Sequence, residues 1–463
     1  MKTEEYLTSL TNQIRCKMAR KDIRDEMKSH IEDQTAAFMR EGMTQEQAEN
    51  AAIAEMGDPV ETGMLLDRIH RPKMAWGMIF LIGLLTLAGF VFQYLLEISI
   101  PDALFANGLK SGQFVRHLIM LAVGLAIMTA ICFCDYSRIG CHAKELTLLL
   151  AAALFLGLIF FGVSINGSPA WISLPGNFSF NAEILCYLFI PLYGGILFQY
   201  RGQGYSGIAK SALWMLPVPC ISIFCSGTLT TLIFLAAIVL ILSIAVMKNW
   251  FQVSRSKTLA LLWSSLLLLP ILLFLLGIHF GAEYQQARLL SIFTGEQESF
   301  LHSSIRSIIS ESRLAGSGAH SAILHDFLTY MGKDYMLLYL IASYGILATV
   351  LIFGIMAFLF LRFLGLALKQ RSQMGMIMGA GCSIVLLLQM LFYILINLGL
   401  MPMGSSSCPF FTLGGSWIVV NYTLLGIMLS IYRYQNVISE RQLKRRLIKF
   451  QIFRTAPEKT VKQ

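Results

Sequence analysis

Residues 227–247, GTLTTLIFLAAIVLILSIAVM, form an uninterrupted apolar stretch without a charged side chain. A helix needs about 20 such residues, at a rise near 1.5 Å each, to cross about 30 Å of hydrocarbon. Nine further segments of the chain meet the same test, namely 75–96, 115–135, 145–164, 183–200, 208–225, 259–281, 335–361, 375–400 and 416–433. The sequence therefore predicts an all-α polytopic membrane protein with ten transmembrane helices.

The composition supports a protein that lies in a bilayer. Hydrophobic residues make up 56% of the 463 residues and charged residues only 14%, whereas about a quarter of a soluble domain is charged. Residues 1–73 hold more acidic than basic side chains, so the net charge of +9 comes from the rest of the chain. This positive excess beside predicted spans indicates contact with an anionic lipid bilayer, and no nucleic acid is expected as a partner.

The first 73 residues read as a separate helical segment. Apolar residues recur there at helical spacing, Thr44 and Gln47 predict a capping box, and Gly57-Asp58-Pro59 ends one helix and starts another. The segment is too charged to be a cleaved leader. We expect a small cytosolic helical domain, either a regulatory head or a simple anchoring module.

Lysine and arginine set the expected orientation, because cytoplasmic loops are enriched in them. With the head inside, both termini are cytoplasmic and most basic residues of the loops fall on the inner side. The outer side keeps only Lys110, Arg116, Arg288, Arg306, Arg313 and Lys333. On this topology residues 74–435 form the membrane domain, residues 282–334 a large extracytoplasmic loop, and residues 436–463 a basic cytosolic tail.

Few acidic side chains lie near the predicted spans, and each is a functional candidate because charge in a bilayer is costly. Glu183 begins the fourth predicted span and Asp334 begins the eighth. A carboxylate at either position could cap a helix or contact a substrate, and the residues alone leave both possibilities open. The sequence contains no Walker loop, GxGxxG, HExxH or metal-binding cysteine and histidine spacing. The cofactor therefore stays unknown, with a divalent cation as one option.

Two stretches resemble the SEDS family, the RodA, FtsW and SpoVE type of cell-shape and division membrane proteins. Residues 398–431, LGLMPMGSSSCPFFTLGGSWIVVNYTLLGIMLSI, are similar to its closing signature, and residues 166–183, NGSPAWISLPGNFSFNAE, to one of its outer loops. The matching positions are Pro402, Pro409, Phe410, Gly414, Gly415 and Ser416 in the first stretch, and Asn166, Gly167, Trp171, Ile172 and Glu183 in the second. The head resembles a permease-prefix domain.

This resemblance implies a peptidoglycan glycosyltransferase that polymerises glycan strands from lipid II at the outer face of the cell membrane, beside a class B penicillin-binding protein. In that family an Asp opens the eighth span at a fixed distance before a Leu-Gly pair. Placing Gly345 on that glycine puts Asp334 on the proposed catalytic Asp, which would act as general base. Asp326 is the rival assignment. The implied substrate-binding residues are Glu183, Arg288, Arg306, Lys333, Trp171 and Ser416.

The chain departs from the family pattern at several polar positions. Cys186 stands for a Lys, Cys225 for an Asp and Tyr393 for an Asn. These replacements leave a second hypothesis open, a catalytically inactive scaffold or lipid-binding regulator of cell-wall synthesis. A third, a transporter of lipid-linked precursors, is disfavoured because few charges lie within the predicted spans. The sequence does not separate roles in elongation, division and sporulation.

Overall fold

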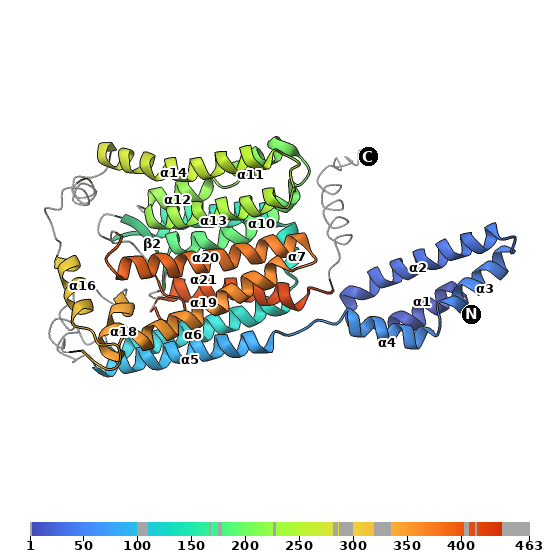
Figure 1. The fold of residues 1–463 in the computed structure, drawn as a ribbon, viewed down its shortest axis with the longest axis horizontal. Helices are drawn as coiled ribbons and strands as arrows, with labels where there is room; N and C mark the ends of the chain where they lie inside the picture. The colour runs from blue at the N-terminus through green and yellow to red at the C-terminus, as the bar shows by residue number, and fades with distance from the viewer. Residues whose placement is uncertain are drawn as a thin grey trace, which may run out of the picture. The chain divides into compact units, whose positions relative to one another are not determined.

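The structure, a computed structural model, describes residues 2–99, 110–165, 168–174, 178–225, 228–280, 286, 300–318, 335–401, 407–412 and 414–437. Contacts within the chain divide it into two units. The first unit comprises residues 1–75, 370–375 and 431–463, and the second comprises residues 76–369 and 376–430. Figure 1 shows that helices dominate both units.

Four helices make up the amino-terminal part of the first unit, the helical head: α1 (Thr3–Asn12), α2 (Lys17–Arg40), α3 (Gln45–Glu55) and α4 (Pro59–Ile69). Their shared core includes Tyr6, Leu7, Leu10, Ile23, Ile31, Ala48 and Ile53. The predicted capping box is present, since the Thr44 N–H donates to Gln47 Oε1 over 3.3 Å. Asp58 caps α4 by accepting from the Glu61 N–H over 3.2 Å. Both predicted helix starts are therefore confirmed.

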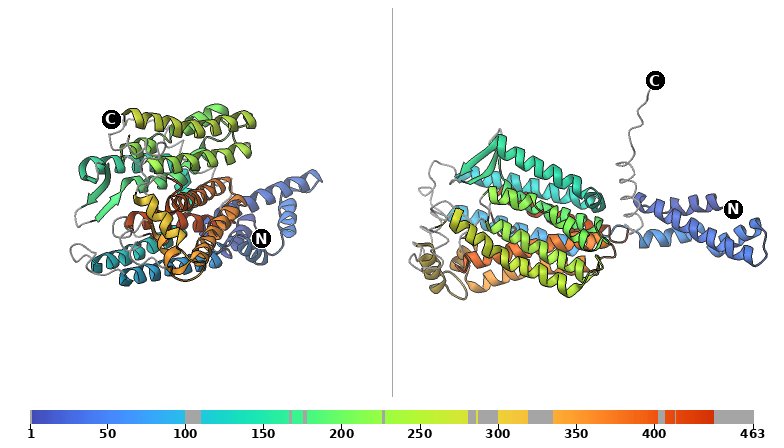
Figure 2. Two further views of the ribbon diagram at one scale, coloured as in Figure 1. Left: turned by 60° about the vertical axis from the view of Figure 1, so that its left-hand side comes forward. Right: turned by 90° about the horizontal axis from the view of Figure 1, so that it is seen from above.

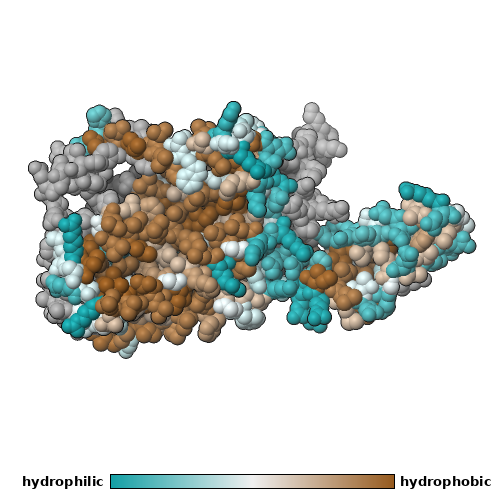
Figure 3. Space-filling model, in the orientation of Figure 1, coloured by the Kyte–Doolittle hydropathy of each residue, from teal (hydrophilic) through white to brown (hydrophobic). Residues whose placement is uncertain are grey.

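Long helices lie side by side in the membrane part of the chain (Figures 1 and 2). They are α5 (Trp76–Ser99), α6 (Lys110–Phe133), α8 (Ala143–Phe161), α10 (Phe189–Gln199), α13 (Thr228–Met247), α14 (Arg255–Phe280), α19 (Ile346–Leu368), α20 (Gln373–Asn397) and α21 (Gly415–Arg433). Within the described residues, eight helical segments are long and apolar enough to cross a membrane. On the face seen in Figure 3, apolar side chains form a broad outer surface. The predicted class, an all-α polytopic membrane protein, is confirmed.

The predicted fifth span is interrupted, so the expectation of one continuous helix over 208–225 is wrong. Two short helices, α11 (Gly204–Leu213) and α12 (Pro217–Phe224), take its place. Pro217 lacks the N–H that would continue α11, but it suits the first turn of a new helix. The predicted seventh span, 259–281, corresponds to α14.

Three short strands between residues 162 and 181 form a small antiparallel sheet, which was not expected from the sequence. Its strands, in the order β1-β2-β3, are β1 (Gly162–Ile165), β2 (Ser168–Leu174) and β3 (Phe178–Asn181). The first strand begins where α8 ends, so the third span ends at Phe161, before the predicted residue 164. Ile172 of β2 packs closely on α8, because a Cβ added to Gly157 would lie 2.9 Å from Ile172 Cδ1. We call the part of the second unit that carries this sheet the sheet end.

The predicted eighth span is also divided. A nine-residue helix, α18 (Met336–Tyr344), is followed by Gly345 and then by α19, which starts at Ile346. Gly345 has φ +90°, a conformation that glycine adopts without a Cβ penalty. The expectation of one continuous helix over 335–361 is therefore wrong. Asp334 itself lies outside the described residues, and its place at the start of the span stays a prediction.

Candidate functional site

Asn181 joins the sheet to two helices at the sheet end. It is the last residue of β3, where it lies opposite Trp171, and its Oδ1 accepts from the backbone N–H groups of Glu183 and Ile184 over 2.9 and 3.3 Å. These bonds cap α9 (Ala182–Leu185), which leads through the 3-10 turn η2 (Cys186–Leu188) into α10. The backbone N–H of Asn181 donates to Ser416 Oγ of α21 over 2.9 Å. One buried residue thus fixes the strand, the helix start and α21.

Glu183 is not the helix cap, since Asn181 has that role. Its side chain is buried, with 6% of the residue exposed, and its Oε1 accepts a hydrogen bond from the Thr230 hydroxyl of α13. No cation in the described part of the chain lies within ion-pair distance of Glu183. A buried carboxyl group is costly unless it is hydrogen-bonded, so the Thr230 contact is needed to hold Glu183 there. We call Asn181, Glu183, Thr230 and Ser416 the polar cluster.

Two thiols lie beside the polar cluster. Cys186 follows Glu183 by less than one helical turn and its Sγ lies 3.4 Å from the Ala182 carbonyl oxygen. The Sγ of Cys225 lies 3.8 Å from the carbonyl oxygen of Pro169, which belongs to β2. Both cysteines are buried. The two positions that carry Lys and Asp in the family pattern therefore contribute small neutral side chains around Glu183.

Residues 408–412, within the stretch that resembles the family's closing signature, pack against α5 shortly before the chain reaches Ser416 of the polar cluster. Phe410 adopts φ +71°, and its carbonyl oxygen lies so close to α5 that a Cβ on Gly89 would approach within 2.1 Å. The side-chain N–H of Gln93 on the same helix donates to the Phe411 carbonyl oxygen. Cys408 closes this turn, its N–H donating to Thr412 Oγ1 over 2.7 Å. These contacts fix the backbone that leads to Ser416.

Helix α18 is anchored at its first turn, immediately after Asp334. The backbone N–H of Leu337 donates to the Tyr393 hydroxyl of α20 over 3.3 Å. Tyr393 is fully buried and stacks on Phe353 of α19, with ring centroids 6.3 Å apart and an interplanar angle of 10°. Tyr393 therefore holds the start of α18 against two long helices.

The other end of α18 is held by residues 313–318. The Gly316 N–H donates to the Tyr344 carbonyl oxygen over 3.2 Å, and the Ile346 N–H donates to that of Arg313 over 3.1 Å. A Cβ on Gly345 would lie 2.8 Å from the Cα of Ala315. Helix α16 (Phe300–Ser310), which precedes this segment, packs against α18. The break at Gly345 is thus built by close backbone contact that a larger residue would disturb.

The structure brings together some of the predicted site residues and not others. Ser416 bonds Asn181, Trp171 pairs with Asn181, and Glu183 is capped by it. Arg306 is exposed on α16. Asp334, Asp326, Lys333 and Arg288 lie outside the described residues. The predicted roles of all these residues remain predictions.

Two residues that were not singled out from the sequence shape this region, Asn181 and Thr230, and Tyr393 was noted there only as a departure from the family pattern. Asn181 carried a readable signal, since Asn before a helix start is a preferred cap. Thr230 gave none, because its partner is distant in the sequence, and the contact of Tyr393 with α18 was unreadable for the same reason. Among the described residues, no group of three His, Cys, Asp or Glu side chains is placed to hold a metal ion.

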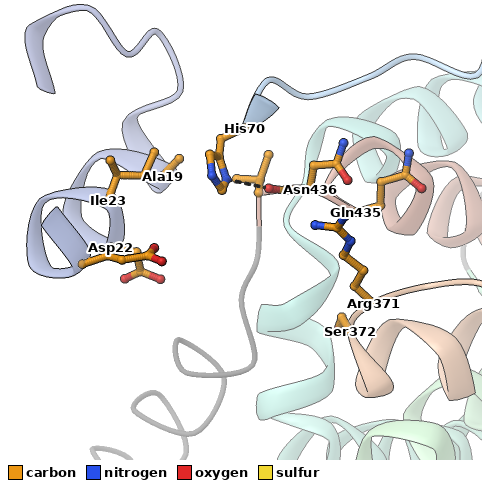
Figure 4. A pocket seen from close by; sticks show the side chains of 10 residues that line it. Ala19, Asp22, Ile23, His70, Arg371, Ser372, Gln435 and Asn436 are labelled. Atoms are coloured by element: carbon orange, nitrogen blue, oxygen red, sulfur yellow. Dashed lines mark hydrogen bonds between the residues drawn. The ribbon is translucent and has the colours of Figure 1, made fainter. Parts of the chain in front are cut away.

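A cavity of about 250 Å³ lies in the first unit, apart from the polar cluster. Asp22 and Arg371 are among its lining residues. Figure 4 shows His70 beside it, with Nδ1 3.0 Å from the carbonyl oxygen of Asn436. None of the predicted site residues lines this cavity, so it is not part of the candidate site.

Known proteins match most of the chain. Residues 75–437 match the family of FtsW, RodA and SpoVE, described as "Cell cycle protein". A relative from Nitrosomonas europaea, named "Probable peptidoglycan glycosyltransferase FtsW", is 26% identical over 370 residues, which are 77% of this chain and 91% of the relative. The peptidoglycan glycosyltransferase MrdB of Escherichia coli K12 is 22% identical over 353 residues, covering 72% of this chain and 90% of the relative. An FtsW relative from Mesostigma viride is 23% identical, and the match spans 58% of this chain and 63% of the relative.

Solved structures share the fold. A chain of a peptidoglycan synthase complex superposes with a TM-score of 0.62 at 20% identity, over 78% of this chain and 98% of that chain. The rod shape determining protein RodA of Thermus thermophilus gives a TM-score of 0.56 at 20% identity, over 78% and 97% of the two chains. The family match covers the second unit and continues to the last described residue. This protein therefore belongs to the FtsW, RodA and SpoVE family of membrane proteins.

Proposed function

We propose that this protein is a peptidoglycan glycosyltransferase that polymerises glycan strands from lipid II at the outer face of the cell membrane. The sheet end then faces outward and both termini are cytoplasmic. The observation that carries the proposal is the junction at Asn181, where the two stretches that resemble the family motifs meet through the bond to Ser416. Two motifs that are far apart in the sequence thus build one buried polar cluster.

In the proposed reaction, Asp334 is the general base. Its carboxylate accepts the proton of an acceptor sugar hydroxyl while that oxygen forms a bond to the anomeric carbon of the donor. The bond from this carbon to the pyrophosphate oxygen breaks, and undecaprenyl pyrophosphate leaves with the bonding electrons. Negative charge grows on the pyrophosphate, so Arg288, Arg306 and Lys333 are proposed to stabilise it.

The anchoring of α18 supports a positioned base. Asp334 precedes Tyr335 directly, and the next turn of backbone is bonded to Tyr393. A general base must lie within hydrogen-bond reach of the proton it takes, and a rigid support helps to keep it there. Glu183 is proposed to shape the substrate groove from the polar cluster. A class B penicillin-binding protein is the proposed partner, and one structural neighbour comes from a peptidoglycan synthase complex.

A second candidate function is an inactive scaffold or lipid-binding regulator of cell-wall synthesis. The neutral surroundings of Glu183 favour it, because Cys186 and Cys225 stand where the family pattern has a cation and a second carboxylate. A site that has lost these charges could keep the fold without turning over substrate.

Polymerisation of labelled lipid II by the purified protein, with and without a class B penicillin-binding protein, separates the two functions. We expect glycan product from the wild type, loss of product in Asp334→Asn, and retention in Asp326→Asn. Glu4→Gln, a change on the helical head, is the matched control for handling and yield. Product that survives Asp334→Asn would contradict the assignment of the base. Absence of product from the wild type with every partner tested would support the scaffold.

A further inference from the structure

Helix α4 of the head is packed on one side only. Gly63 faces α1 so closely that a Cβ there would lie 2.6 Å from the carbonyl oxygen of Leu10. One helical turn later, Asp67 is buried and its Oδ1 accepts from the Arg15 N–H over 2.8 Å. Gly63 and Asp67 thus lie on the face of α4 that packs against the rest of the head, and this face is small and polar.

The opposite face of α4 is apolar and exposed. Leu65 and Ile69 lie four residues apart, and Met64 flanks them, with exposed fractions of 58%, 55% and 55%. Residues at this spacing share a helix face. A solvated helix normally turns polar residues outward, so α4 has its apolar side where water is expected. We call Met64, Leu65 and Ile69 the outer face of α4.

Basic side chains accompany this face at its carboxyl end. Arg68 lies within the last turn of α4, and Arg71 and Lys73 follow in the linker, all three exposed. The acidic residue Glu61 lies in the first turn, at the other end of the helix. Apolar side chains bordered by cations are the pattern of a helix that lies in the interface of an anionic membrane.

The end of α4 is also fixed near the end of a membrane-spanning helix within the first unit. His70, the residue after α4, bonds the carbonyl oxygen of Asn436 (Figure 4), and the Lys73 N–H donates to that of Arg433 over 3.1 Å. Arg433 is the last residue of α21, a candidate span. The chain then enters α5 at Trp76. Both contacts lie within the first unit and join the carboxyl end of α4 to residues 433–436, and only two residues separate Lys73 from the start of α5.

We propose that the outer face of α4 and the basic residues after it form a binding surface for anionic phospholipid. The apolar side chains insert among the acyl chains next to the headgroups, and Arg68, Arg71 and Lys73 contact lipid phosphates. This role concerns the head and does not depend on the glycosyltransferase reaction. It gives the head a means of responding to the lipid composition of the leaflet that it faces.

The test uses the full-length protein in nanodiscs with a photoreactive amino acid at Leu65. The matched control places the same group at Met39 of α2, an apolar residue with 47% exposure. In discs that contain phosphatidylglycerol we expect lipid adducts at position 65 at several times the yield at position 39. The yield should fall severalfold in discs of phosphatidylcholine alone, and again in high salt.

A charge variant tests the basic part separately. Arg68→Gln, Arg71→Gln and Lys73→Gln combined should lower the adduct at position 65 in phosphatidylglycerol discs, while melting of the protein stays unchanged because all three side chains are exposed. Equal adduct yields at positions 65 and 39 would overturn the proposal. So would crosslinking in cells to a protein, if the purified protein gave no lipid adduct.

Discussion

The sheet end of the second unit and the helical head hold their carboxylates in opposite ways. Glu183 is buried at the sheet end and is bonded by a neutral hydroxyl, whereas Glu4 of the head is 62% exposed and lies beside Arg24 and Lys28. Removing a hydrogen bond from a buried polar group lowers the free energy of unfolding strongly. An exposed ion pair contributes little to it, because solvent screens the charges. The hydrogen bond between Thr230 and Glu183 should therefore contribute more to stability than the ion pairs of Glu4.

The largest expected effect is that of Thr230→Val, which keeps the shape of the side chain and removes the only described hydrogen bond to the Glu183 carboxyl group. A buried polar group left without its partner should destabilise the protein by about 1–3 kcal/mol. Thr147→Val is the matched control, because the Thr147 hydroxyl bonds a carbonyl of its own helix, α8. Thermal unfolding in detergent should show a larger drop for Thr230→Val. Equal drops in melting temperature would mean that the hydrogen bond to Glu183 stabilises the protein no more than the hydrogen bond of Thr147 within α8.

Asn181→Ala should come next. It removes the cap of α9, at a cost of about 2 kcal/mol, whereas the loss of the exposed cap in Asp58→Ala should cost about 1 kcal/mol. Asn181→Asp keeps the accepting oxygen but adds negative charge two residues from Glu183, so it should not restore full stability. The measurement is the shift in melting temperature of each variant. Full rescue by Asp would show that a negative charge beside Glu183 carries no cost.

The buried Tyr6 of the helical head should make its stability depend on pH. Burial raises the pKa of Tyr6 above its ordinary value near 10, the negative charge of Asp58 adds to the rise, and the hydrogen bond with Thr62 opposes it. A raised folded-state pKa gives stability that is complete below pH 10 and is lost as the pH rises above it. Hydrogen exchange of α1 should therefore rise more steeply above pH 10 in the wild type than in Tyr6→Phe. Parallel curves would show that Tyr6 stays neutral.

The class of the membrane part was predictable because the length of an apolar run is a local property of the sequence. The breaks within the runs were not. Gly345 lies inside a stretch that reads as one span, and the turn there exists because residues 313–318 bond to both sides of it. The small sheet was missed for the same reason, since Ile172 is held by its fit against Gly157 of α8. Tertiary contacts of this kind leave no periodic signal.

The candidate site, too, was predictable only in part from the sequence. Glu183 and Ser416 were named from the resemblance of their motifs, but the bond that brings the two motifs together passes through Asn181. Thr230, which lies 47 positions from Glu183, could be found only from the folded chain. The motifs therefore predicted which segments carry polar residues of the site. The hydrogen-bond partners of those residues depend on the folded chain and could not be predicted.

The smallest expected effect is that of Glu4→Gln, and it tests the other half of the comparison. The Lys28 Nζ lies 3.9 Å from the Glu4 carboxylate, and the partners Arg24 and Lys28 are 41% and 49% exposed. Solvent screens such pairs, so the loss should be about 0–1 kcal/mol and should vanish in about 1 M salt, where the Debye length is about 3 Å. Hydrogen exchange of α1 and α2 in the full-length protein, at low and high salt, measures it. A loss that persisted at high salt would mean that the contact of Glu4 with Arg24 acts as a shielded hydrogen bond, and the contrast between the two regions would be one of degree.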